Sequence, residues 1–315
     1  MSGPSISFDG REPVDTVLAK ADAAVKAGVG SIWLACHLFQ RDPITTASVL
    51  LGRHPTLDIV LVAISPYVMH PVHAAMSAAT LDEFFPGRVS LCLGAGAPAD
   101  LASVGVTAER PLAAMREALT LCRRLFAGET VVFEGERFAI SGRALGSGMC
   151  AVPLLLAASG PKMLRLAGSA ADGVLLSAGA SPEFIAWSLE QVEAGDPPSD
   201  FLRCGLVYGL VDSDQALARD RVRGVLATVL RGDHHAHNLA LAGSQLDQPK
   251  LRASETPEAL ITDDIVDRHA AAGTPDAFRQ RVDAYRAAGL DAPIFASMRT
   301  PAQIAALATA LNGSE

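Results

Sequence analysis

Short apolar segments of strand length alternate with longer segments of helical period along the whole 315-residue chain. Strands that are apolar on both faces and separated by helices are typical of a parallel sheet, which needs cover on both sides. Eight such units predict an α/β fold, a TIM-type (β/α)8 barrel, and leave an open doubly wound sheet as the alternative. The expected strands lie near residues 5–8, 31–35, 58–63, 89–94, 152–157, 173–177, 204–210 and 293–297.

The clearest helical segments cover residues 14–28 and 111–128. Each ends at a glycine, Gly28 or Gly128, as the C-terminal ends of helices commonly do. No linker or low-complexity tract interrupts the alternation of strands and helices. We therefore expect residues 1–315 to form a single domain.

Two intervals, residues 129–151 and 213–275, are too long for simple connections between barrel elements. The first alternates around Glu134 and Gly135 in the manner of a β-hairpin. Insertions after barrel strands usually lie over the active face, so both intervals are predicted to cover the C-terminal strand ends.

Charge and hydropathy limit the partners of the chain. The net charge is −8, and its 26 lysines and arginines are dispersed, so a nucleic-acid partner is not expected. No apolar run approaches the roughly 20 residues of a membrane-spanning helix, and the N-terminal sequence has no signal-peptide core. The five cysteines have no zinc-ligand spacing and are expected to be mostly reduced core thiols, so the sequence predicts a cytoplasmic protein without a membrane partner.

An ionisable side chain, His37, follows the second predicted strand in the stretch SIWLACHLFQRDP. Barrel enzymes place their chemistry at the C-terminal ends of strands, which makes His37 a candidate functional residue. A histidine that only packs and forms a hydrogen bond is the alternative. The third strand likewise ends at Ser65-Pro66, where the proline restricts Ser65 to extended geometry.

The stretch LCLGAGAPA fits a G-x-G-x-x-A pattern through Gly94, Gly96 and Ala99. A dinucleotide-binding motif requires a helix that begins within the glycines, whereas Pro98 and the broken sequence after it predict no helix before about residue 111. The Rossmann interpretation is therefore rejected. Glycines at a barrel strand end still let a flat ring approach the backbone.

The strongest candidate anion site is the turn at Ser159 and Gly160, before Pro161 at a predicted first helical position. Free backbone N–H groups at a helix N-terminus attract anions, and Lys162 adds a mobile positive charge. A strand–helix turn capped by serine is the equally open alternative.

Three histidines, His234, His235 and His237, lie close together in RGDHHAHN and raise the possibility of a metal hydrolase. No HExxH motif or repeated carboxylate spacing accompanies them. A solvated or substrate-covering segment is the preferred interpretation, and no metal is expected.

Several stretches, taken in order, resemble the bacterial luciferase-like monooxygenase superfamily and, more closely, its deazaflavin branch, typified by methylenetetrahydromethanopterin reductase. The stretches cover most of residues 14–184 and again 270–291, and they read AGVGSIWLACHLFQRDPITT, SPYVMHPVHAAMSAATLDEFFPGRVSLCLGAG, RPLAAMREALTLCRRLFAGETVVFEGERF, VPLLLAASGPKMLRLAGSAADGVLLSAGASPE and AAAGTPDAFRQRVDAYRAAGLD.

This resemblance implies a TIM-type barrel that binds coenzyme F420, or alternatively FMN, at the C-terminal strand ends. His37 matches a histidine that contacts the reactive ring, while Cys36 stands where an aspartate is usual. Asp100, where relatives often have asparagine, is a further residue that reaches toward the ring. A bulge with a non-prolyl cis peptide is expected at Val62-Ala63, against the back of the ring.

The implied catalytic residue is His37. The implied cofactor-binding residues lie at the ends of four strands and are Val62, Ala63, Ile64, Ser65, Gly94, Ala95, Gly96, Ala97, Ala157, Ala158, Ser159, Gly160 and Ser177.

The expected function is hydride transfer between the deazaflavin of F420 and a small organic substrate, with the protein as a homodimer. An FMN-dependent monooxygenase and a non-catalytic flavin-binding protein are the alternatives, since a fold does not by itself imply activity. Substrate contacts are expected in the segment 213–275, where Arg221, Arg223 and Arg231 are either anion-binding or solvent-exposed.

Overall fold

The structure, a computed structural model, describes residues 3–313. Within that range, eight parallel strands close into a barrel, because the last strand pairs back with the first. The predicted (β/α)8 barrel is confirmed, and the alternative of an open sheet is wrong. The barrel strands, in spatial order, are β1 (Ser5–Phe8), β2 (Ser31–Ala35), β3 (Asp58–Ile64), β4 (Val89–Leu93), β7 (Leu154–Ala158), β8 (Gly173–Leu176), β9 (Leu202–Val211) and β11 (Ala292–Ala296).

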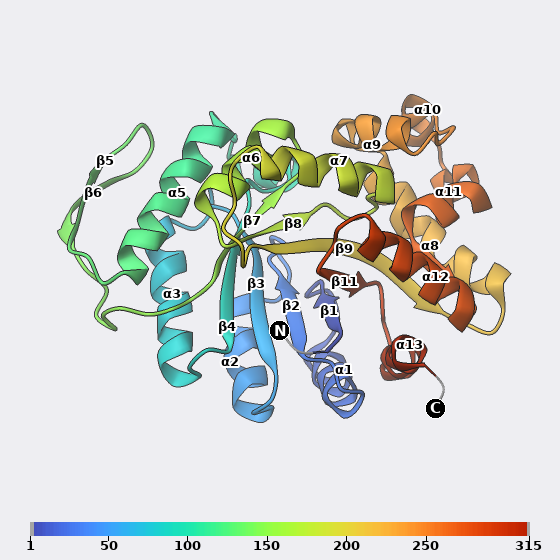
Figure 1. Cartoon of the computed structure of the whole chain (residues 1–315), viewed down its shortest axis with the longest axis horizontal. Helices are drawn as coiled ribbons and strands as arrows, with labels where there is room; N and C mark the ends of the chain where they lie inside the picture. Colours follow the sequence, from blue (N-terminus) through green and yellow to red (C-terminus); the bar gives the residue numbers. More distant parts are fainter. Residues whose placement is uncertain (1–2, 314–315) are drawn as a thin grey trace.

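Helices surround the barrel, and all but the first begin at a proline, whose fixed φ suits the first helical position (Figure 1). The predicted helices at 14–28 and 111–128 are confirmed, and Gly28 and Gly128 follow them with φ of 76°. No helix within residues 3–313 is long and apolar enough to cross a membrane. The surrounding helices are α1 (Val14–Lys26), α2 (Pro43–Arg53), α3 (Pro71–Phe84), α5 (Pro111–Phe126), α6 (Pro161–Ala170), α7 (Pro182–Glu193), α12 (Pro275–Ala287) and α13 (Pro301–Asn312).

Large side chains fill the barrel interior. Trp33 is fully buried, and its indole N–H donates to Ser31 Oγ at 3.2 Å, while Ser31 Oγ donates to Ser5 Oγ at 2.8 Å. A solid interior means that a ligand binds at one end of the barrel rather than within it. The other buried side chains of this interior cluster are Val60, Val62, Cys92, Leu155, Leu175, Cys204 and Ile294.

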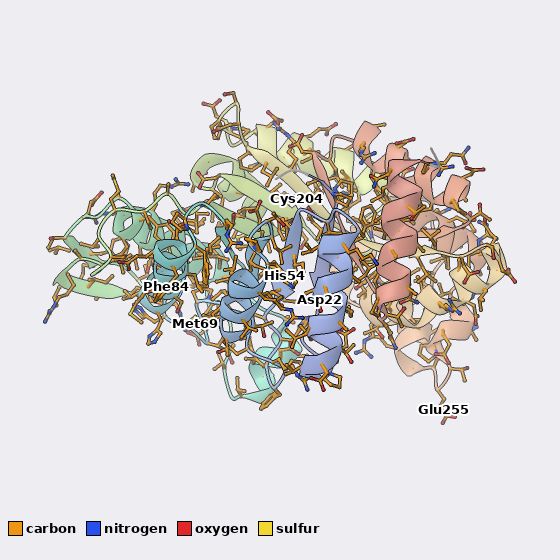
Figure 2. All side chains as sticks on the ribbon, turned by 90° about the horizontal axis from the view of Figure 1, so that it is seen from below. Asp22, His54, Met69, Phe84, Cys204 and Glu255 are labelled. Carbon is orange, nitrogen blue, oxygen red and sulfur yellow. The ribbon has the colours of Figure 1, made fainter. Side chains whose placement is uncertain are left out.

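The outer helices are joined by polar contacts as well as by apolar packing. Asp22 on α1 faces His54 at the end of α2, as Figure 2 shows, and its carboxylate accepts two hydrogen bonds of 2.8 Å from Arg53. The hydrogen bond from Arg53 lowers the pKa of Asp22. Because these groups are largely exposed, solvent screens the pair and its contribution to stability is small.

The first insertion forms the predicted hairpin, with β5 (Val131–Glu134) antiparallel to β6 (Ala139–Arg143). It follows helix α5 and lies along the outside of that helix, so its expected place over the C-terminal strand ends holds only for its tip (Figure 1). Glu117 on α5 fixes the tip by accepting backbone hydrogen bonds from residues 136–138. At the tip, Arg137 stacks over the ring of Tyr67 in the loop after β3, at 4.3 Å.

The second insertion follows β9, on the C-terminal side of the barrel, and has a hydrophobic cluster of its own. Its elements gather at the opposite end of the molecule from the hairpin (Figure 1). The sequence prediction missed the strand in it, which pairs with β9 as Ala271 to Gly209, because Ala-Ala-Gly has no strand pattern. The elements are α8 (Gln215–Leu230), α9 (Ala236–Leu241), α10 (Gln248–Ala253), α11 (Asp263–His269), β10 (Ala271–Gly273) and two short 3-10 turns at Asp233–His235 and Pro257–Leu260.

A six-residue helix, α4 (Pro98–Ser103), follows β4. The prediction that no helix begins before residue 111 is therefore wrong. Pro98 occupies the first helical position, where its missing N–H costs nothing, and Asp100 lies in the favourable first turn. The chain then breaks at Arg110, which has a left-handed φ of 48°, and α5 begins at the next residue.

Candidate functional site

His37 lies in the loop after β2, at the C-terminal end of the barrel. Its side chain is 41% exposed, and Nδ1 lies 4.0 Å from Asp100 Oδ2 on α4. The loops after two strands that are not neighbours, β2 and β4, therefore bring an imidazole and a carboxylate together. Such a pair can hold and transfer a proton at the mouth of the barrel.

Cys36, which precedes the histidine, is partly buried, and its backbone N–H donates to the carbonyl oxygen of Val62 at 2.5 Å. Burial, and secondarily the charge of Asp42, raises the pKa of the Cys36 thiol. The thiol is therefore neutral at neutral pH and does not supply a negative charge. Asp100 is the carboxylate nearest to the ring of His37 in ion-pair range.

The ends of β3, β4 and β7 form a floor of small residues above the barrel interior. The peptide Val62-Ala63 is cis, at the position that the resemblance predicts, and the ladder with β4 shifts register between Leu61 and Ile64. A Cβ added at Gly94 would lie 2.8 Å from Ala63 Cβ and 3.3 Å from Ala157 Cβ. This floor therefore requires glycine at position 94, and its side chains are small and apolar.

Ser65 ties the loops after β3 and β4 together. Its hydroxyl donates to the carbonyl oxygen of Ala95 at 3.0 Å and accepts from the N–H of Tyr67 at 3.3 Å. Gly96 has a φ of 87°, which favours glycine, and together with Ala97 it is exposed. The Ser65 hydroxyl proton is thus used within the protein, which leaves the loop backbone to face a ligand.

The loops after β7 and β8 lie side by side. Ala158 pairs with Leu176 in the parallel ladder, so Ser159 and Ser177 follow at equivalent places on neighbouring strands. Gly160 caps α6 without a side-chain hydrogen bond, and a Cβ added there would meet nothing within 4 Å. The N-terminus of α6 therefore opens onto free space, and the positive end of the helix suits an anion.

The arginines and histidines of the second insertion do not converge on this site. Arg221 pairs with Asp212 at 3.0 Å, and Arg223 pairs with Asp263. His235 is buried, whereas the ring of His237 packs against Trp187 at 4.4 Å. Across residues 3–313, histidine, cysteine and acidic side chains nowhere form a group of three that could hold a metal ion.

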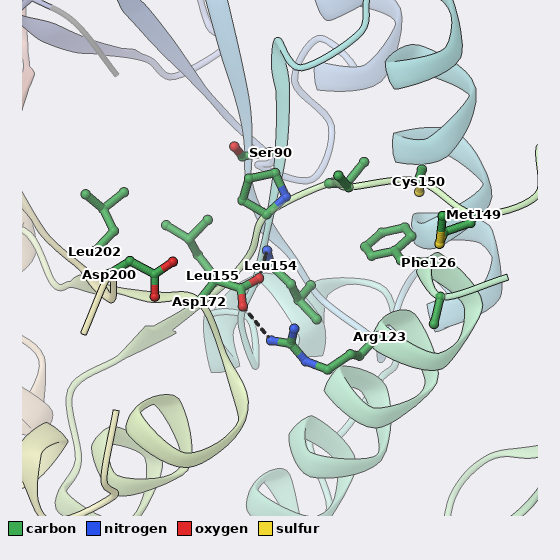
Figure 3. A pocket seen from close by; sticks show the side chains of 14 residues that line it. Ser90, Arg123, Phe126, Met149, Cys150, Leu154, Leu155, Asp172, Asp200 and Leu202 are labelled. Atoms are coloured by element: carbon green, nitrogen blue, oxygen red, sulfur yellow. Dashed lines mark hydrogen bonds and ion pairs between the residues drawn. The ribbon is translucent and has the colours of Figure 1, made fainter. Parts of the chain in front are cut away.

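A cavity of about 640 Å³ lies at the other end of the barrel, where strands begin (Figure 3). Ser90, Leu155 and Leu202 line it from the first residues of their strands, and Asp172 binds Arg123 at 2.8 Å at its side. Barrel enzymes use the C-terminal face, so this cavity is separate from the site around His37.

The closed barrel, with its polar and glycine-rich loops at the C-terminal strand ends, places the chain in the (β/α)8 class of ligand-binding proteins and enzymes. The model of the luciferase-like monooxygenase family matches residues 3–292, and the chain belongs to this family.

Individual relatives of the chain carry the names of reductases and dehydrogenases. A 5,10-methylenetetrahydromethanopterin reductase of Archaeoglobus fulgidus is 29% identical over 282 residues, with 85% of each chain covered. The structure of a coenzyme F420 dependent tetrahydromethanopterin reductase from Methanopyrus kandleri is similar with a TM-score of 0.82, at 20% identity and 98% coverage of both chains. An F420-dependent secondary alcohol dehydrogenase in complex with an F420-acetone adduct has a TM-score of 0.80, at 20% identity, over 98% of this chain and 99% of that one. At these identities the structural matches show a shared fold.

Proposed function

We propose that this protein is an F420-dependent oxidoreductase, which passes a hydride between the deazaflavin ring and a small organic substrate. The floor at Ala63, Gly94 and Ala157 carries the proposal, since it is apolar and built only from residues whose side chains are a methyl group or a hydrogen atom. The names of the matched reductases and dehydrogenases agree with this cofactor.

The residues at the four strand ends fit a cofactor with a flat ring and an anionic tail. The small residues of the floor would hold the ring, and Ser159 and Gly160 at the N-terminus of α6, where the helix end favours negative charge, would hold the phosphate. The residues proposed to hold the cofactor are Val62, Ala63, Ile64, Ser65, Gly94, Ala95, Gly96, Ala97, Ala157, Ala158, Ser159, Gly160 and Ser177.

When bound, the deazaflavin supplies the carbon that accepts or donates the hydride. The chain supplies orientation and a proton site. Beside a bound ring, His37 would hold or donate a proton, and the Asp100 carboxylate lies 4.0 Å from its Nδ1. A half-exposed histidine at the mouth of the barrel can reach both the solvent and a substrate above the floor.

Titration of the purified protein with F420 and, separately, with FMN tests the proposal. F420 is expected to bind with a micromolar or lower Kd, detected by quenching of its fluorescence, and FMN much more weakly. Tight FMN binding without F420 binding would instead support a flavin-dependent monooxygenase, the alternative that the family description favours. If the protein binds the cofactor but turns over no substrate in a panel of alcohols, aldehydes and pterins, the result would support a non-catalytic flavin-binding protein.

The remaining expectations are part of the same proposal. We place the protein in the cytoplasm as a single-domain subunit of a homodimer, with a small-molecule substrate and no nucleic-acid or membrane partner. Substrate contacts come from the second insertion, which follows β9 on the side of the barrel where the cofactor site lies.

A further inference from the structure

Side chains from the second insertion hold the loop between β8 and α7, residues 177–181. The carbonyl oxygen of Gly179 accepts two hydrogen bonds, one from Asn238 Nδ2 on α9 at 2.8 Å and one from His269 Nδ1 on α11 at 2.9 Å. Asn238 Oδ1 accepts a third from the backbone N–H of Ser181 at 3.0 Å. Asn238, His269 and Ser181 are each 0% exposed.

The surroundings of these two side chains fix their hydrogen-bonding roles. A carbonyl oxygen only accepts, so His269 carries its proton on Nδ1, and Nε2 then accepts from Ser244 Oγ at 2.7 Å. Asn238 Nδ2 also lies 3.3 Å from His235 Nδ1, to which it can donate its second proton. A buried network with its members satisfied is rigid and tolerates little displacement.

Gly179 brings the loop close to the helices of the second insertion. Gly179 adopts a left-handed φ of 73°, and a Cβ added there would approach Leu230 and Val229 of α8 at 3.4 and 3.5 Å. Helices α8, α9 and α11 therefore all contact this one turn. The turn begins at Ser177, which follows the strand beside the loop of Ser159 and Gly160.

We propose that Asn238 and His269 are positioning residues, which hold the β8–α7 loop in the geometry that receives the cofactor. The inference rests on the proposed cofactor site, and it gives the second insertion a role besides substrate contact. A purely structural network would anchor the insertion to the barrel without affecting the cofactor. The two roles predict different results for variants that remain folded.

The test compares three variants of the full chain by F420 fluorescence titration in buffer without denaturant. Circular dichroism under the same conditions checks that each variant is folded. His269→Ala removes the bond to Gly179 and is expected to raise the Kd about tenfold, the effect of one lost buried hydrogen bond. His269→Asn keeps an amide nitrogen near the position of Nδ1 and should restore most of the affinity. Gly146→Ala is the control, because a Cβ at Gly146 would meet nothing within 4 Å, so its Kd should stay within about twofold of the parent.

An unchanged Kd in His269→Ala, with a lower free energy of unfolding, would overturn the proposal and leave a purely structural network. Amide hydrogen exchange gives a readout that needs no cofactor. In Asn238→Ala the protection of the Ser181 amide should fall, while the amides of residues 166–168, which are buried in α6, stay protected. Equal protection of Ser181 in parent and variant would overturn the inference as well, whereas failure of the parent to bind F420 would overturn only the proposed function.

Discussion

At the scale of single residues, the exposure of His37 separates a chemical role from a packing role. A packing histidine is usually buried with both ring nitrogens bonded, as His269 is. The side chain of His37 is 41% exposed, and the polar contact described for it is Asp100 at 4.0 Å. The ring is therefore available to a substrate or a cofactor, as the proposed proton-transfer role requires.

The substitution His37→Asn should keep the Kd for F420 within a few fold, because the floor and the α6 N-terminus do not involve this ring. The value of kcat/KM should fall by about 10²- to 10⁴-fold, the usual span for a lost general acid or base. Steady-state kinetics with the first substrate found in the panel, together with fluorescence titration, provide the measurement. A parental turnover rate would assign His37 to packing, and a loss of roughly 1–3 kcal/mol in unfolding free energy would accompany that role.

Gly94 is the residue on which the floor depends. In Gly94→Ala the added methyl group meets Ala63 Cβ at 2.8 Å, and since that neighbour is a short side chain on a strand end, the strand itself must shift. We expect the Kd for F420 to rise by about tenfold or more and the free energy of unfolding to fall by about 1–3 kcal/mol.

Gly146→Ala is the matched control, because a Cβ at Gly146 meets nothing within 4 Å. The control should leave both quantities near their parental values. Cofactor affinity in Gly94→Ala equal to that of the control would show that the ring does not lie on this floor.

Sequence reasoning identifies site residues that stand beside a strand end and misses those that act across the fold. His37 and Gly94 follow apolar strands directly, so their place in a barrel could be predicted. Asn238 and His269 contact Gly179 from 59 and 90 residues away, inside a segment without a clear pattern. The spacing of residues along the sequence does not predict such a contact, and only the tertiary structure brings the three residues together.

At the scale of elements, burial on both faces explains why the eight barrel strands are predictable. A strand such as β8, whose residues are all buried, reads as a short apolar run between turn residues. Two short elements, α4 and β10, have too few residues to show a period, and the sequence does not predict either of them. The helices of the second insertion were anticipated only as a long interval, because their arrangement depends on packing against β9 and on one another.

The buried network of the second insertion predicts a dependence of stability on pH. Burial lowers the pKa of His269 to about 4; the nearby Arg281 and Arg268 lower it further, and Glu183 opposes this shift. Burial likewise lowers the pKa of His235 to about 3, and His234 adds to the shift. The pKa of an unfolded histidine is about 6.5, so between about pH 4 and 6.5 the unfolded chain binds more protons than the folded one. The free energy of unfolding therefore falls as the pH drops through this range.

Denaturant unfolding at pH 7 and 5.5 measures this loss. Each buried histidine is expected to contribute roughly 1 kcal/mol to it. The variant His269→Asn, which has no titrating ring at this position, should lose about half of the dependence. An equal pH dependence in parent and variant would mean that His269 is not the neutral buried base that the structure describes.

At the scale of the whole molecule, the filled barrel interior divides the surface into separate regions. The proposed cofactor site lies at one end, the hairpin lies along α5, and the second insertion lies at the opposite side from the hairpin (Figure 1). A further region remains on the outside of the barrel, where α2 and α3 form a groove of about 540 Å³ lined by uncharged residues. Sequence reasoning predicted the homodimer from resemblance but gave no surface for it.

The homodimer is part of the proposed function, and we propose this groove as its contact surface. Phe84 and Met76, which line it, are 75% and 45% exposed, and Figure 2 shows Phe84 on α3 at the surface. Most soluble homo-oligomers have two-fold symmetry, in which the same surface patch of both subunits forms the contact. An uncharged apolar patch can pack against its own copy, whereas a patch with charges of one sign would repel its copy. An apolar face of this kind is costly to leave in water.

The substitution Phe84→Glu should therefore give a monomer, because the two-fold axis brings two new carboxylates close together in an apolar contact. Light scattering coupled to gel filtration measures the mass, which should be that of two chains in the parent and of one 32.7 kDa chain in the variant. Met149→Glu is the control, since Met149 is 80% exposed but lies at the base of the barrel beside the cavity of Figure 3. A dimeric Phe84→Glu, or a monomeric Met149→Glu, would place the contact between subunits elsewhere on the barrel.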